Sequence, residues 1–204
     1  TEEAQEVVSD NTLPLARLNL PEGFEIQLYA EGVENARSMA MGDDGTLFVG
    51  TRRANKLYAI QDADGDYRAD RVILLDSTLE VPNGVAFRDG SLYVAQVNRL
   101  LRYPGIEQQL DNPPTPEVIY DDYPTEFHHG WKYIAFGPDD KLYVPVGAPC
   151  NVCERTDPRY ATIMRMAPDG AELEVFARDV EEARHWFFTR LDDLVRDLRE
   201  RLDP

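Results

Sequence analysis

The chain has 204 residues, and 38 acidic against 21 basic side chains give it a formal net charge of −17 at pH 7. This charge makes nucleic acids and anionic membrane surfaces poor partners, because both are themselves negative. The length allows a sizeable hydrophobic core, and no apolar run is long enough to span a membrane, so we expect one water-soluble domain.

The N-terminal residues 1–19 are interpreted as a polar leader. The opening TEEAQEVVSDNT lacks the apolar stretch of a signal peptide, so we read it as a mature N-terminus or a mobile polar segment.

One pattern then occurs three times, over residues 39–60, 85–103 and 134–147. Each copy has an apolar strand, a tight turn containing Asp, and a Leu-aromatic-Val strand that begins at Leu47, Leu92 or Leu142. The spacing of about 45 to 50 residues is the period of four-stranded propeller blades. The repeat therefore predicts an array of blades.

A second β-rich element comes between the copies, over residues 24–33, 71–82, 116–124 and 172–180. We interpret these segments as outer strands, each leading into the next blade. The fold class is therefore all-β, and residues 20–179 are predicted to form a partial β-propeller of about three four-stranded blades.

The loop DADGDYRAD is the strongest metal-like motif. Its carboxylates can converge on a hard cation such as Ca²⁺, and its glycine eases a tight turn. The loop departs from an EF-hand at its sixth and twelfth positions, and a solvated acidic turn explains the same composition. The candidate calcium ligands are Asp62, Asp64, Asp66 and Asp70.

Two further motifs carry chemistry. His128 and His129 precede the third inner strand, where imidazole groups can move protons near neutral pH or serve a structural role. Cys150 and Cys153 are spaced as a CxxC pair, which suits a structural disulfide, free thiols, redox exchange or half a zinc site. We favour the disulfide, which would indicate an oxidising compartment.

The C-terminal residues 180–204 show apolar side chains every three or four positions, including Phe187, Leu191, Leu194 and Leu198. This period predicts one amphipathic helix. The helix is expected to pack on the last blade or to associate with a second copy, so a homodimer through the helix or an open blade edge is a candidate assembly.

The chain resembles the glucose/sorbosone dehydrogenase family, which comprises six-bladed propellers that oxidise sugars with pyrroloquinoline quinone (PQQ). The resemblance lies in the repeat, in PNGVAFRDGSLYVAQVNRLLRY, and in a histidine eight residues before Gly137. It implies that His129 is the catalytic base, that PQQ and Ca²⁺ are cofactors, that a sugar is the substrate, and that the protein is periplasmic or secreted. A basic residue often found four before the glycine is replaced here by Tyr133, with Lys132 one position earlier.

The resemblance covers about residues 20–179, the N-terminal half of the family's ring. The blades that hold most of the quinone contacts have no counterpart in this sequence. We therefore expect a sugar dehydrogenase half that is inactive alone. The alternative is a non-catalytic half-propeller scaffold, closed or dimerised by the C-terminal helix.

Overall fold

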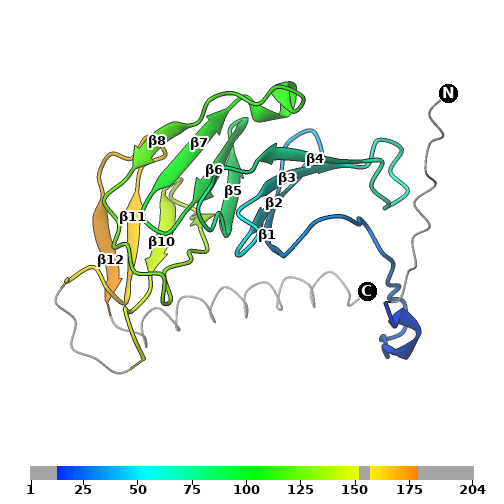
Figure 1. The fold of residues 1–204 in the computed structure, drawn as a ribbon, viewed down its shortest axis with the longest axis horizontal. Helices are drawn as coiled ribbons and strands as arrows, with labels where there is room; N and C mark the ends of the chain where they lie inside the picture. The colour runs from blue at the N-terminus through cyan, green and yellow to red at the C-terminus, as the bar shows by residue number, and fades with distance from the viewer. Residues whose placement is uncertain (1–12, 152–156, 179–204) are drawn as a thin grey trace.

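The computed structural model describes residues 13–151 and 157–178. Their strands form three four-stranded antiparallel sheets that follow one another along the molecule (Figure 1). Within each sheet the strands lie in chain order, as in a propeller blade. The predicted all-β architecture with three blades is thereby confirmed.

The first sheet contains β1 (Ala36–Met41), β2 (Leu47–Thr51), β3 (Leu57–Gln61) and β4 (Arg71–Asp76). The second contains β5 (Gly84–Arg88), β6 (Ser91–Ala95), β7 (Leu100–Pro104) and β8 (Glu117–Tyr120). The third contains β9 (Ala135–Phe136), β10 (Leu142–Val146), β11 (Thr162–Met166) and β12 (Glu174–Arg178). Two 3₁₀ turns, η1 (Leu15–Arg17) and η2 (Ile106–Gln109), complete the described elements.

The hydrophobic core lies in the two layers between neighbouring sheets. Strand β6 contributes to both layers, because successive side chains of a strand point to opposite faces. Leu92 and Val94 pack toward the first sheet, whereas Tyr93 and Ala95 pack toward the third. The Leu-aromatic-Val pattern of the repeat is thus a strand that is apolar on both sides.

The outward face of the first blade is only partly covered. Tyr29, Ala30 and Val33 pack on the middle of this face, against the buried Val49, Tyr58 and Ile60. On β1, Met39 and Met41 remain 59% and 58% exposed, and on β4, Leu74 is 49% exposed. We call the surface formed by Met39, Met41, Val72 and Leu74 the open face of the first blade.

One strand prediction was wrong. Residues 24–33 were expected to form an outer strand, but this segment is not paired in any sheet. Instead the Ala69 N–H donates a hydrogen bond of 2.7 Å to the Tyr29 carbonyl, which ties the segment to the acidic loop. The outer position of the first blade is occupied by β4, so the segment is not one of the four strands of this blade.

Two predictions cannot be followed in the structure. The C-terminal helix over residues 180–204 lies outside the described residues, and so does Cys153. No helix within residues 13–151 and 157–178 is long and apolar enough to cross a membrane.

Candidate functional site

Several loops meet at one end of the three sheets. Because strands alternate in direction, the ends of β2, β6 and β10 lie at the same end of their blades as the starts of β5 and β9. The segments that gather there are residues 52–56, 80–83, 96–99, 125–134 and 147–151. Loops at such an end of a propeller surround its axis, where ligands bind. We call this end the rim.

Glycines allow the rim loops to pack main chain against main chain. A Cβ atom added to Gly50 would lie 2.4 Å from the Pro82 carbonyl oxygen, and one added to Gly84 would lie 2.5 Å from that of Lys132. At Gly147 the added atom would lie 2.1 Å from the His129 carbonyl oxygen. Distances under 3.0 Å are not tolerated, so these glycines fix how closely neighbouring blades approach.

His129 lies in a tight turn and is half-buried. Its φ of 55° is in the left-handed region, which costs free energy for a residue with a side chain. Gly130 follows it, and any Cβ there would lie 2.1 Å from the Glu126 carbonyl oxygen. The turn is therefore held by packing on both sides, and His129 belongs to none of the core clusters between the sheets.

The His129 ring belongs to a group of cationic and aromatic side chains drawn from different loops. Its centroid lies 4.0 Å from that of His128 and 5.9 Å from that of Trp131. The guanidinium carbon of Arg52 lies 3.5 Å from the Trp131 ring centroid, a cation–π contact. We call Arg52, His128, His129 and Trp131 the rim cluster.

The rim cluster is free of ion pairs with acidic residues in the described part of the chain. Arg71, Arg88, Arg102, Arg159 and Arg165 each pair with a carboxylate. Arg52 is half-buried yet pairs with no described carboxylate. Its positive charge therefore remains available to an anionic group, in a protein whose net charge is otherwise strongly negative.

Two neighbouring side chains complete the surroundings of the turn. His128 Nε2 lies 3.4 Å from Asn151 Oδ1, which links the turn to the segment after β10. A hydrogen bond with Tyr160 lowers the pKa of the Glu126 carboxyl. Glu126 is thus an ionised group that already has a partner.

Lys132 and Tyr133 take opposite positions. Lys132 is 1% exposed and points into the interior, whereas Tyr133 is 55% exposed. Lys132 therefore does not take the place of a substrate-facing basic residue. Its burial has a sequence signal, because it precedes the buried Ile134 by two positions and so falls on the same side of the extended chain.

The predicted calcium ligands come together in part. Carboxylate oxygens of Asp62, Asp64 and Asp70 lie within 4.8 Å of one another, and Asp66 is not in this group. Several of these oxygens also accept backbone N–H groups of the loop, for example Asp62 from Gly65 at 2.8 Å. Both interpretations, a calcium loop and an acidic turn, are compatible with this geometry. The loop joins β3 to β4 at the end of the first blade opposite the rim.

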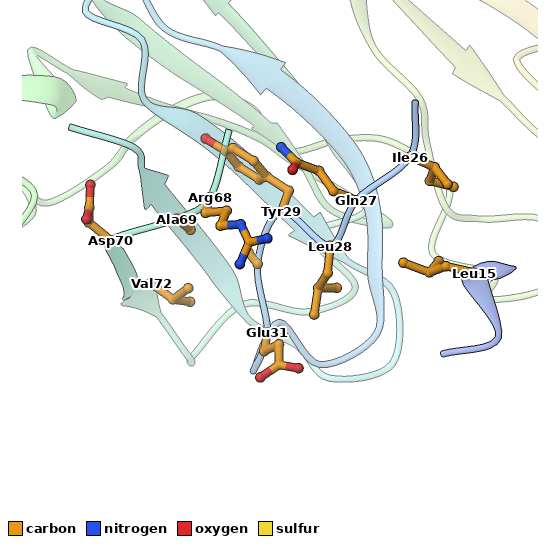
Figure 2. A pocket seen from close by; sticks show the side chains of 11 residues that line it. Leu15, Ile26, Gln27, Leu28, Tyr29, Glu31, Arg68, Ala69, Asp70 and Val72 are labelled. Carbon is orange, nitrogen blue, oxygen red and sulfur yellow. The ribbon is translucent and has the colours of Figure 1, made fainter. Parts of the chain in front are cut away.

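An open groove of about 600 Å³ lies between this loop and the N-terminal segment. Figure 2 shows Gln27, Leu28 and Tyr29 on one side, with Arg68 and Asp70 on the other. Burial, followed by the charges of Asp62 and Asp70, raises the pKa of Tyr29. The groove lies at the outer edge of the first blade and shares no residue with the rim cluster.

Only one of the two cysteines of the predicted disulfide, Cys150, lies among the described residues. No free cysteine occurs among the described residues, which include Cys150 after β10. Since Cys153 lies outside the described residues, the Cys150–Cys153 disulfide stays a prediction.

Comparison with solved structures finds similar folds, including those of the following three proteins. The holo PQQ domain of pyranose dehydrogenase from Coprinopsis cinerea aligns with a TM-score of 0.63 and 14% identity, over 74% of this chain and 38% of that chain. The calcium structure of a family AA12 carbohydrate-active enzyme from Trichoderma reesei aligns with a TM-score of 0.60 and 20% identity, over 78% of this chain and 41% of that chain. The PQQ-bound aldose sugar dehydrogenase from Streptomyces coelicolor aligns with a TM-score of 0.54 and 21% identity, over 71% of this chain and 48% of that chain.

These likenesses establish the fold, since all three identities are below 25%. The chain spans less than half the length of each of these structures. A curated relative, an uncharacterized protein from Borreliella burgdorferi, is 20% identical over 146 residues, 66% of this chain and 37% of that protein. No protein-family model matches the sequence.

Proposed function

We propose that this chain provides one part of the active site of a PQQ-dependent sugar dehydrogenase, with His129 as the catalytic base. The rim cluster is the observation that carries the proposal. It lies at the loop end of three blades whose fold is shared with PQQ-binding sugar dehydrogenases. An aromatic ring and the Arg52 guanidinium beside an imidazole suit a flat, anionic cofactor and a neutral sugar.

The residues present fit the charge of the quinone, a tricarboxylate. Arg52, which pairs with no described carboxylate, would hold one of its anionic groups, and Trp131 would border its ring system. When bound, PQQ supplies the two-electron acceptor that receives hydride from the sugar carbon. The chain's own side chains offer no comparable acceptor.

His129 would accept the proton of the sugar hydroxyl while that carbon becomes a carbonyl carbon. The packed turn and Gly147 hold its main chain in one place, which serves a base that must meet the hydroxyl within hydrogen-bond distance. Because the structurally similar enzymes are more than twice as long as the matched region, we propose that other blades complete the site and that this chain alone does not turn over.

Titration of the purified chain with PQQ and CaCl₂ tests the proposal. We expect saturable quenching of the Trp131 fluorescence, identified by its loss in Trp131→Phe, and weaker quinone binding in Arg52→Gln. Dye reduction with aldoses is then measured with and without additional blades from a homologous dehydrogenase. His129→Gln should abolish any turnover without weakening quinone binding more than His128→Gln does. A chain that binds no quinone under any of these conditions supports the non-catalytic scaffold instead.

For the acidic loop we propose a structural calcium site, separate from catalysis because it lies at the end opposite the rim. Calcium should then raise the melting temperature, and Asp62→Asn should abolish the increase. Asp89→Asn, which alters an exposed carboxylate outside this loop, is the matched control. An equal response in both variants would indicate an acidic turn without a specific ion.

We further propose a periplasmic or secreted location, which rests on the Cys150–Cys153 disulfide. Mass spectrometry of protein alkylated without reduction decides the pairing. Two alkylated thiols would remove this support.

A further inference from the structure

Lys132 is buried to a degree that is unusual for a lysine. It is among the largest side chains that are completely buried, at 1% exposed. It forms no salt bridge with any acidic residue of the described ranges. Burying an ammonium group away from water is costly unless it is paired or fully hydrogen-bonded. The hydrogen bonds of the Lys132 ammonium group are therefore what can compensate for its burial.

Its hydrogen bonds join separate loops of the rim. The Nζ atom donates to the Val97 carbonyl oxygen at 2.7 Å, in the β6–β7 loop, and to the Gly130 carbonyl oxygen at 3.1 Å, in the His129 turn. The Lys132 carbonyl oxygen in turn accepts a hydrogen bond of 2.8 Å from Asn83 Nδ2. One residue thus connects the middle blade to the loop that carries His129.

The surroundings of the ammonium offer dipoles and a ring but no anion. The Nζ atom lies 4.9 Å from the centre of the Tyr123 ring. Burial raises the pKa of Tyr123, so this side chain stays neutral, and its buried hydroxyl has no hydrogen-bond partner among the described residues. The nearest acidic residue in the chain, Glu126, is hydrogen-bonded to Tyr160. Burial accordingly lowers the pKa of Lys132 to about 8.

We propose that Lys132 is a positioning residue of the candidate site, which fixes the Gly130 peptide and with it the turn that presents His129 and Trp131. Gly130 immediately follows His129, and Trp131 stands between Gly130 and Lys132 in the chain. A change in the bonds made by Nζ is therefore transmitted to both rim side chains through the shared peptides. The chemical role of His129 rests on the proposed function, whereas the placement of its turn does not.

A purely space-filling lysine would pack as a methylene chain, and its protonation would leave the rim unchanged. For a positioning lysine, a change in protonation should also change the rim, because its bonds to carbonyl oxygens weaken when the ammonium loses its charge. The test is therefore whether the signals of the rim side chains change when Lys132 loses its proton.

The experiment uses the full chain without quinone, calcium or sugar. The lysines are Lys56, Lys132 and Lys141, so selective ¹³C labelling of lysine Cε gives a simple spectrum whose signals are assigned by single substitutions. Histidine Cε1 and tryptophan indole signals are followed in the same samples from pH 6 to 11. We expect Lys132 to titrate near pH 8, because burial lowers its pKa, whereas the contact with Glu34 raises the pKa of Lys56. The His129 and Trp131 signals should show an inflection at the same midpoint.

Substitution provides the second arm. In folded Lys132→Met, the His129 and Trp131 signals should move from their wild-type positions. The matched control Lys141→Met loses the ion pairs of Lys141 with Glu172 and Glu174 on the third blade and should leave them unchanged. If Lys132→Met fails to fold, the wild-type titration decides alone. The proposal is overturned if Lys132 titrates with the surface lysines, or if the rim signals do not respond at its midpoint. Neither result depends on whether the chain binds a quinone.

Discussion

At the residue scale, His129 is one of nine residues other than glycine that have a positive φ in the described part of the chain. A left-handed conformation costs a residue other than glycine about 1 kcal/mol or more. The neighbouring Gly130 and Gly147 permit the close main-chain contacts that hold it. This packing distinguishes the half-buried His129 from the exposed His128.

Replacing Gly147 with alanine tests this packing. The new methyl group would lie 2.1 Å from the His129 carbonyl oxygen, so the His129 main chain must move. We expect a loss of unfolding free energy on the order of 1–3 kcal/mol in urea denaturation, together with a displaced His129 imidazole resonance. Gly42→Ala is the control, because its methyl group would meet only the end of the Glu107 side chain, which can rotate away. A normal His129 resonance in Gly147→Ala would show that the turn is not held by this contact.

Lys132 also predicts a pH dependence of stability. Its folded pKa of about 8 is below the ordinary value of 10.5, so the unfolded chain binds more protons between these two values. The contribution of Lys132 to unfolding free energy should therefore rise with pH across this window, by up to about 1.4 kcal/mol per unit. The difference in unfolding free energy between wild type and Lys132→Met, measured from pH 7 to 10.5, isolates this slope from other groups. A constant difference would contradict the lowered pKa.

At the scale of elements, the strand pattern was predictable because its cause is local. Each Leu-aromatic-Val strand is preceded by a turn with glycine or aspartate. Because both faces of these strands are buried, apolar residues occur at successive positions. The segment over residues 24–33 has an equally β-rich composition but forms no strand, because pairing depends on a partner edge that the sequence of the segment does not encode. Composition predicts that a segment can be extended, and only topology decides whether it is paired.

In the candidate site, too, local patterns could be predicted from the sequence and contacts between blades could not. His128 and His129 were noted from their position before the third inner strand, and the family resemblance singled out His129. Arg52 was missed, because its contact with Trp131 joins loops of different blades. The role of Lys132 was missed for the same reason, since its acceptor Val97 belongs to another blade.

The core layer between the first two sheets and the open face of the first blade predict unequal effects for matched substitutions. Leu92 on β6 is 0% exposed between the first and second sheets, whereas Leu74 on β4 is 49% exposed. Leu92→Ala should lower the unfolding free energy by about 2–5 kcal/mol, because it removes buried methyl groups and leaves a cavity. Leu74→Ala should change it by about 0.5 kcal/mol. Equal losses in urea denaturation would mean that β4 is covered in solution.

At the scale of the whole molecule, apolar surface and net charge act against each other. The open face of the first blade leaves Met39 and Met41 more than half exposed, at the position where a preceding blade would pack in a closed ring. A second copy offers a partner for such a face, yet each copy carries a net charge of −17. Repulsion between copies is long-ranged only at low salt, since the screening length falls from about 30 Å at 0.01 M to about 8 Å at 0.15 M.

Self-association through the open face should therefore depend on salt. We expect light scattering to report the monomer mass at 0.01 M NaCl and a mass that rises with protein concentration at 0.15 M. Met41→Glu should keep the chain monomeric at 0.15 M, because association would bury an unpaired carboxylate in an apolar contact. Val118→Glu on β8 adds the same charge at a residue that is 55% exposed, compared with 58% for Met41, and should associate like wild type. If the two variants behave alike, net charge rather than the open face controls association, and if wild type stays monomeric at both salt concentrations, the exposed methionines do not form an interface between copies.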